Sequence, residues 1–133
     1  MAMRKLIHAD QLEPIEVDKE LRRGTQPWRN YQHRCFERAA KYVLRHAEVP
    51  GIRLVHGRYH VGKLGDRGIG HSWVELPGSI IFDPNEQQFY DRDQYYEALA
   101  IESDVSYDGK SACGLMASSG HCGPWQDDSE GTT

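Results

Sequence analysis

The longest helical pattern in the chain begins at Cys35. Apolar side chains then recur at helical spacing, at Phe36, Ala40, Val43, Leu44 and Ala47. This period predicts a buried helix, which Val49-Pro50-Gly51 is expected to end. Two weaker helices are expected, one around residues 17–23 closed by Gly24 and one at about 92–101 capped by Asp91. The apolar stripe of the last helix is formed by Tyr95, Tyr96, Leu99 and Ala100.

Alternating polar and apolar positions predict strands between these helices. The segment after Pro50-Gly51 predicts a strand over residues 52–61, and the alternation around His71 predicts another over residues 68–76. A short apolar strand over residues 79–82 ends at Asp83, because Pro84 cannot extend a strand ladder. Pro77-Gly78 favours a tight turn, so the second and third strands should form an antiparallel hairpin. The third strand is expected to continue or bend into residues 88–90.

The remaining segments carry weaker patterns. Residues 1–27 are a polar lead-in, residues 28–125 form the main domain, and the acidic residues 126–133 are expected to be a disordered tail. Residues 103–133 as a whole are rich in Ser, Gly and Asp, which predicts loosely structured chain. The polar linker over residues 59–70 contains four glycines and is expected to be a mobile lip.

Size, charge and cysteine content exclude several functions. The chain has 133 residues, enough for one domain, and its net charge of −4 gives no footprint for nucleic acid or an anionic membrane. No apolar run approaches the roughly 20 residues of a membrane span, and the N-terminus lacks a secretory core, so a cytoplasmic location is expected. Three cysteines cannot all pair; Cys113 and Cys122 could bridge, although a reducing cytosol argues against it.

Three residues in chain order suggest a catalytic site. A thiol at Cys35 would lie at a helix start, where unpaired backbone N–H groups and the helix dipole favour the thiolate. His71 and Asp83 lie on the two arms of the hairpin, 83 − 71 = 12 residues apart, so the carboxylate can orient the imidazole. A thiol, a base and an orienter are the components of nucleophilic catalysis.

Each of these residues also has a structural explanation. An unpartnered Cys35 would be a core residue, His71 could bond to backbone, and Asp83 before Pro84 could serve the turn alone. Trp73 is expected to pack in the core beside the site, with substrate contact as its alternative, and Glu75 to form a structural ion pair.

Two further motifs are discounted. His46-Ala47-Glu48 matches the His-x-Glu of zinc deaminases, but the Pro-Cys-x-x-Cys partner is missing. Cys113, His121 and Cys122 lack zinc-ligand spacing, although a redox or metal role stays open. Neither a metal nor a cofactor is expected.

The ordered set resembles a known family. The Cys35 helix, the Gly51-Ile52 strand, His71-Ser72-Trp73-Val74-Glu75 and Asp83-Pro84 are similar to the transglutaminase-like superfamily of cysteine enzymes, over roughly residues 30–90. The nearest likeness is to the small leader peptidases of lasso-peptide biosynthesis. The resemblance implies an α+β, papain-like fold in which a nucleophile-bearing helix packs on a small, mostly antiparallel sheet. Arg34 before the thiol and Asn85 after Pro84 depart from the family pattern.

The expected chemistry is thiol-dependent acyl transfer. His71 takes the Cys35 proton, the thiolate attacks a carbonyl, and a thioester forms that water hydrolyses. The Cys35 N–H is the first oxyanion donor; Trp28, Asn30, Gln32 and Trp73 are candidates for further oxyanion or substrate contacts.

Three functions stay open on this site: a cysteine peptidase or amidase, a glutamine deamidase or transamidase, and a non-catalytic peptide-binding module. The expected partner is a peptide or protein substrate, with a separate recognition protein as a further candidate. Neither nucleic acid nor membrane is expected as a partner.

Overall fold

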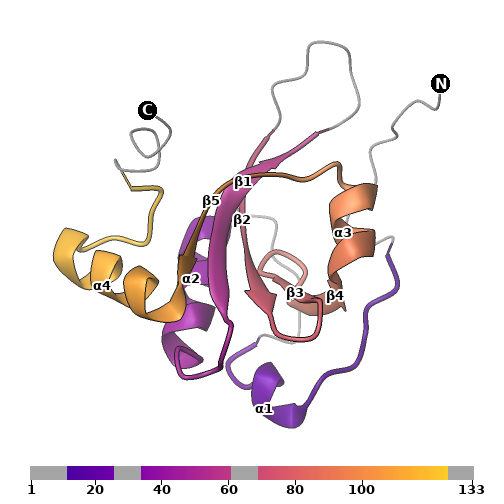
Figure 1. Cartoon of the computed structure of the whole chain (residues 1–133), viewed down its shortest axis with the longest axis horizontal. Coiled ribbons are helices and arrows are strands. Elements are labelled where there is room, and N and C mark those ends of the chain that lie inside the picture. Colours follow the sequence, from indigo (N-terminus) through magenta and orange to yellow (C-terminus); the bar gives the residue numbers. More distant parts are fainter. Residues whose placement is uncertain (1–11, 26–33, 61–68, 126–133) are drawn as a thin grey trace.

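A computed structural model describes residues 12–25, 34–60 and 69–125, and these form an α+β fold around one antiparallel sheet. The strand order is β4-β3-β2-β1-β5, and every neighbouring pair is antiparallel (Figure 1). The strands are β1 Arg53–Tyr59, β2 Ile69–Leu76, β3 Ile80–Asp83, β4 Gln88–Asp91 and β5 Glu102–Asp108. The helices are α1 Lys19–Arg22, α2 Cys35–Arg45, α3 Arg92–Ala98 and α4 Gly109–Ser119. The expectation of an α+β fold on an antiparallel sheet is confirmed.

The expected hairpin joins β2 to β3. Its turn places Gly78 at φ 84° and Ser79 at φ 61°, the left-handed region that a tight turn requires. Pairing runs from Leu76 opposite Ile80 to Val74 opposite Phe82. Because β2 begins at Ile69, its first half extends past the last β3 pair and, among the described strands, is paired with β1 alone. His71 lies in this stretch, opposite Gly57 of β1.

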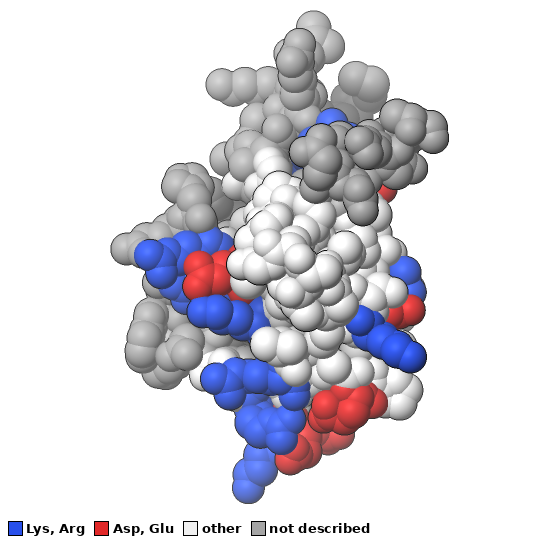
Figure 2. Space-filling model, turned by 90° about the vertical axis from the view of Figure 1, so that its left-hand side faces the viewer, with Lys and Arg blue, Asp and Glu red and all other residues white. Residues whose placement is uncertain are grey.

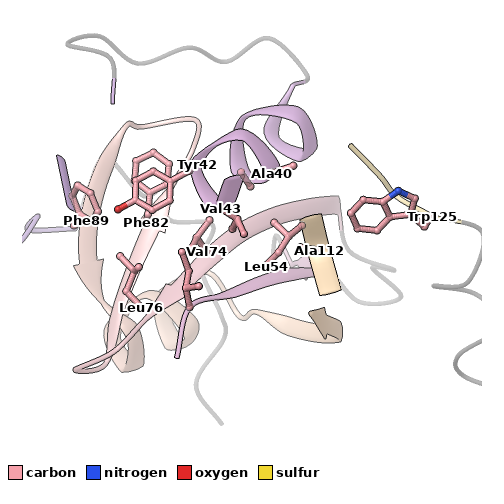
Figure 3. Packing of buried hydrophobic residues seen from close by; sticks show 12 residues of the cluster. Ala40, Tyr42, Val43, Leu54, Val74, Leu76, Phe82, Phe89, Ala112 and Trp125 are labelled. Atoms are coloured by element: carbon pink, nitrogen blue, oxygen red, sulfur yellow. The ribbon is translucent and has the colours of Figure 1, made fainter. Parts of the chain in front are cut away.

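Helix α2 covers one face of the sheet. Ala39, Ala40, Tyr42 and Val43 are buried and form one hydrophobic cluster with sheet residues, among them Leu54, Val74 and Phe82. Figure 3 shows Tyr42 against Phe82, whose rings stack at 4.3 Å, and Trp125 closing the far end. Burial of this apolar stripe explains why the periodic segment forms a helix here.

The opposite face packs against α3. Val55, Trp73, Ile81 and Tyr90 project to this side and form a second cluster with Tyr95 and Leu99 of the α3 region. Successive strand residues point to opposite faces, so His71 shares the face of Trp73, and Asp83 that of Ile81. The base and the carboxylate predicted from the sequence are therefore on the α3 side, whereas the helix that carries Cys35 is on the other.

Two segments show how the chain runs after an expected element. Of the two courses expected after Pro84, the structure has the bend: the chain reverses, and β4 pairs antiparallel with β3, with Asp83 opposite Gln88. Helix α3 ends at Ala98 rather than Ile101, because Ala100 takes a positive φ of 50° and the chain turns toward β5.

Over residues 103–119, the expectation of loosely structured chain was wrong. Strand β5 pairs with β1, and α4 follows it with Asp108 as its N-cap. The Asp108 carboxylate accepts a hydrogen bond from the Ser111 N–H at 2.7 Å, and Gly120 ends α4 with a φ of 78°. β5 is an edge strand with mainly polar residues, and α4 is built from small residues, so neither has strong periodicity.

The described part of the N-terminal lead-in packs on the domain. Ile15 donates a backbone hydrogen bond to the Phe89 carbonyl at 2.8 Å, and the Tyr42 hydroxyl donates to the Leu21 carbonyl at 2.6 Å. Most of the expected linker at residues 59–70 and the acidic tail at 126–133 lie outside the described residues. Of the helices described, none has both the length and the apolar character needed to cross a membrane.

Candidate active site

Cys35 is the first residue of α2 and is partly exposed. Arg34 precedes it with non-helical angles, φ −131° and ψ 23°, and gives no side-chain cap. The first backbone N–H groups of a helix have no partner within the helix, and they carry the positive end of its dipole. The thiol thus lies where a negative charge on sulfur is stabilised.

His71 is 3% exposed and held between aromatic rings. Trp73 stacks against it with ring centres 5.4 Å apart, and Tyr59 meets it edge-on at the same distance. The Nε2 atom lies 2.8 Å from the Tyr95 hydroxyl oxygen and 3.7 Å from Asp83 Oδ2. Cys35 is close enough to His71 for their interaction to raise the pKa of the imidazole. Because Nε2 faces Tyr95 and Asp83, Nδ1 is the nitrogen left for the sulfur.

Tyr95 connects His71 to Asp83. Its hydroxyl donates to Asp83 Oδ2 at 2.5 Å, and its oxygen can then accept the hydrogen on His71 Nε2. The sequence predicts a direct contact between imidazole and carboxylate. The structure brings the two groups together but places a phenol hydroxyl in the hydrogen-bonded path between them.

The other carboxylate oxygen of Asp83 holds the turn that follows. Oδ1 accepts hydrogen bonds from the backbone N–H groups of Asn85 at 2.7 Å and Glu86 at 2.9 Å. These bonds form an Asx-type turn, the structural role proposed as an alternative to catalysis. Asp83 therefore holds the turn with one oxygen and accepts the Tyr95 hydroxyl with the other, and the turn fixes the direction of the carboxylate.

Charge is shared across the buried network. Burial lowers the pKa of His71, but hydrogen bonding and attraction to Asp83 and Cys35 outweigh it and raise the pKa to about 9. Burial raises the pKa of Asp83, yet the charge of His71 and the Tyr95 hydroxyl bring it below its usual value. Burial and the Asp83 carboxylate raise the pKa of Tyr95 well above that of free tyrosine. Near neutral pH the network is an imidazolium, a neutral phenol and a carboxylate.

Sequence reasoning missed the role of Tyr95. Its position in the apolar stripe of α3 is correct, since it is fully buried in the second cluster. The available signal was chemical: a buried tyrosine hydroxyl usually has a hydrogen-bond partner. The identity of that partner depends on how α3 packs on the sheet.

Trp73 and Glu75 form a second polar chain beneath the site. Trp73 is 0% exposed, and its Nε1 donates to the Tyr96 hydroxyl at 3.0 Å, which in turn donates to Glu75. Trp73 therefore packs against the His71 ring from the protein interior. It is not exposed at the surface, where a substrate would bind. No described ion pair includes Glu75. The other oxyanion candidates, Trp28, Asn30 and Gln32, lie outside the described residues.

The discounted motifs also have defined positions. His46 is 1% exposed, stacks on Tyr42 at 4.2 Å, and has Nε2 at 2.8 Å from the Arg23 carbonyl, which is a structural environment. Cys113 on α4 and Cys122 after it are free thiols. Within residues 12–25, 34–60 and 69–125, no group of His, Cys, Asp and Glu is arranged to hold a metal ion.

Comparisons of the chain with protein-family models, with curated proteins and with solved structures found no match. The geometry of the site is therefore the basis for assigning a function.

Proposed function

We propose that the protein is a thiol-dependent acyl-transfer enzyme that hydrolyses a peptide or amide bond. The observation that carries this proposal is the position of His71, which is buried between Cys35 on one side and Tyr95 with Asp83 on the other. Nucleophile, base and orienter are thus in mutual contact in the order that the chemistry needs.

The reaction begins from the ion pair in which the Cys35 proton already resides on His71, and the Cys35 thiolate attacks the substrate carbonyl carbon. The carbonyl oxygen becomes an oxyanion, which the backbone N–H of Cys35 can stabilise. Protonated His71 then gives its proton to the leaving nitrogen, the carbon–nitrogen bond breaks, and a thioester to Cys35 remains. His71 next takes a proton from water, whose oxygen attacks the thioester, and the acid leaves as the thiol re-forms.

The same arrangement supports a papain-like or transglutaminase-like architecture, in which the thiol is on a helix and the base and carboxylate are on neighbouring antiparallel strands. By the sequence resemblance, we infer a peptide or protein substrate, delivered with a separate recognition protein as in leader peptidases. If an amine replaced water in the second step, the products would be those of a transamidase; the residues named here act on the reacting carbonyl in both reactions.

Selective alkylation tests the proposal. Iodoacetamide at limiting concentration should modify Cys35 at least about tenfold faster than Cys113 and Cys122, because a thiolate held by an imidazolium is the reactive form. The other two cysteines are internal controls in the same sample, and peptide mass mapping gives all three rates. His71→Gln should remove the difference. Equal rates for the three thiols in folded protein would contradict the proposal.

Trapping of the acyl-enzyme separates catalysis from binding. The protein should be incubated with a peptide library, quenched in acid and weighed intact. A mass increase that Cys35→Ala abolishes would identify the acyl group. Rapid alkylation of Cys35 without any acylation or cleavage across the library would instead favour the peptide-binding module.

A further inference from the structure

We propose that a row of cationic side chains on α2 binds an acidic segment of the peptide substrate next to Cys35. The row, here called the basic stripe, consists of Arg34, Arg38, Lys41 and Arg45. This inference rests on the proposed function, because it names the substrate class of the same site.

Helical geometry makes the stripe a continuous feature. Arg38, Lys41 and Arg45 are spaced by three and four positions, which places them on one face of α2, and Arg34, the residue before the helix, comes four positions ahead of Arg38. Cys35 lies beside its first member, at the start of the same helix. Figure 2 shows Lys and Arg side chains at the left and lower left of the face it views, with acidic side chains among those at the left, further charged groups at the right and lower right, and a largely uncharged centre.

The stripe borders a pocket of about 290 Å³. All of its residues line this pocket, and Tyr42 and Phe82 contribute apolar side chains to it. Glu37 also lines the pocket, but it pairs with Lys41 at 2.8 Å, and the same contact lowers the Glu37 pKa. A hollow with cationic and aromatic side chains can hold both carboxylates and the apolar parts of a peptide.

The arginines of the stripe have unused capacity for anions. None of the ion pairs formed by described residues includes Arg34, Arg38 or Arg45. The Arg38 Nε atom is buried and has no hydrogen-bond partner among the described residues. A buried donor without a partner costs free energy, which a bound carboxylate would recover. Among the residues that the structure describes, the pocket therefore offers no acceptor to the Arg38 Nε atom.

The dimensions favour an extended peptide over a compact anion. At about 1.5 Å per residue, the stripe spans roughly 16 Å, too long for a single phosphate. Its charges recur about every 5 to 6 Å, close to the roughly 6.6 Å between alternate side chains of an extended chain. The net charge of −4 argues against nucleic acid as the partner. The best match is a peptide with acidic residues at alternate positions, within about five residues of the bond that Cys35 attacks.

Fluorescence anisotropy can test the stripe without a known substrate. The probe is a labelled peptide that alternates Glu with Ser, and its Gln-Ser and Lys-Ser counterparts are controls. The acidic peptide should bind, and its affinity should fall as salt rises to about 0.15 M, because exposed charges are screened. Arg38→Gln should weaken binding about two- to fivefold, and the triple change R34Q/R38Q/R45Q about tenfold or more. Lys110→Gln on α4 removes the same charge elsewhere and should change nothing.

Other outcomes would overturn the proposal. Equal binding of the acidic and neutral peptides would do so, as would a Lys110→Gln effect as large as that of Arg38→Gln. Tighter binding of an oligothymidine of equal charge would assign the stripe to nucleic acid instead. Circular dichroism melting curves of each variant show whether a lost signal reflects unfolding, and the single Arg38→Gln change keeps the test open if the triple variant is unstable.

The same assay distinguishes this inference from the proposed function. Cys35→Ala should bind the acidic peptide as the parent protein does, since it removes the nucleophile and leaves the stripe. Fast, His71-dependent alkylation of Cys35 without acidic-peptide binding would disprove the stripe alone. Acidic-peptide binding with an unreactive Cys35 would disprove the enzyme alone.

Discussion

At the scale of single residues, the hydroxyl of Tyr95 determines how Asp83 acts on His71. A carboxylate 3.7 Å from Nε2 attracts the imidazolium, but the phenol oxygen at 2.8 Å is the closer acceptor. Hydrogen bonds to charged groups in a dry interior are strong, and such chains reinforce one another. Tyr95 is therefore a positioning residue that fixes the ring orientation and leaves Nδ1 for the thiol.

Replacement of Tyr95 by Phe should slow the alkylation of Cys35 by about threefold near pH 8.5 and little near pH 7, because loss of a charged hydrogen bond of about 1.5 kcal/mol lowers the pKa of His71 by about one unit from about 9. The measurement is the alkylation rate of Cys35 across pH. Tyr96→Phe is the matched control, since its hydroxyl serves Trp73 and Glu75 and does not touch Asp83 or His71. A Tyr95→Phe profile that overlays the parent profile would disprove the positioning role.

The raised pKa of His71 also predicts the alkaline limit of catalysis. Protonation of the leaving nitrogen needs the imidazolium, which is lost as pH passes through about 9. Turnover of any amide substrate identified by trapping should therefore fall on an alkaline limb near this pH, and hydrolysis of an activated ester, whose leaving group needs no proton, should not. A limb near the ordinary histidine value of 6.5 would show that the Asp83 and Cys35 contacts do not hold the proton.

At the scale of elements, β1 and β5 approach closely at Gly57. A Cβ atom at this position would overlap the Glu102 carbonyl oxygen and would lie 2.9 Å from the Trp73 ring. The β1–β5 register also shifts between His56 and Gly57, which is a β-bulge. The backbone oxygen cannot rotate away as a side chain would. Glycine is thus required here by space, and the Trp73 ring that supports His71 depends on it.

Gly57→Ala should lower the free energy of unfolding by about 2 kcal/mol or more, within the range for overpacked interiors, and it should also slow Cys35 alkylation by displacing Trp73. Gly70→Ala on β2 is the matched control, because a Cβ there meets nothing within 4 Å. Urea denaturation measures the first effect. Similar unfolding midpoints for the two variants would mean that β5 does not lie as close to β1 as described.

At the scale of the whole molecule, the buried network makes stability depend on pH. The pKa of His71 is about 9 when folded and near 6.5 when unfolded, so the folded protein binds more protons between these values. The contribution of His71 to the free energy of unfolding is complete below about pH 6.5 and is lost as pH rises through about 9. The pKa of Asp83 is lower in the folded protein than in the unfolded chain. Its contribution to the free energy of unfolding is therefore present above about pH 4 and is lost as pH falls through the pKa of the folded state.

The free energy of unfolding should therefore decline from pH 6.5 to 9, by as much as about 3 kcal/mol from His71. Urea titrations at several pH values measure the decline, and His71→Gln should flatten it. The comparison uses the slopes of the two curves, so a constant loss of stability in the variant does not matter. Parallel slopes would show that His71 does not titrate as described.

The sequence predicts helices and strands correctly where the local periodicity agrees with the packing of the folded protein. The α2 segment has an apolar stripe and a Pro-Gly stop, and the β2–β3 hairpin has alternation around a Pro-Gly turn; both form close to the expected positions. The hairpin also brings His71 and Asp83 to one face, as their spacing implied. These features depend on residues that are neighbours in the chain.

The missed features depend on distant contacts. Strand β5 is mostly polar and forms because it pairs with the edge of β1. The paired residues are about 50 positions apart in the sequence; Arg53, for example, lies opposite Asp108. The small residues of α4 form no clear apolar stripe. Asp108 can be recognised as the N-cap of α4 only when it is known that β5 ends there. The bridge through Tyr95 likewise requires α3 to dock beside Asp83. No local pattern carries that information.

The two hydrophobic clusters have a consequence for a chain that is still folding. Cys35 comes from the α2 layer, whereas His71, Asp83 and Tyr95 are on the α3 side of the sheet. In a partly folded molecule, with only one of the two clusters packed on the sheet, the Cys35 thiol would lack the His71 base. Unfolded segments of a chain are the easiest peptides to cleave, and within one molecule they are present only while its own cysteine lacks its base. Assembly of both layers thus protects an enzyme of the proposed kind from digesting itself before it is complete.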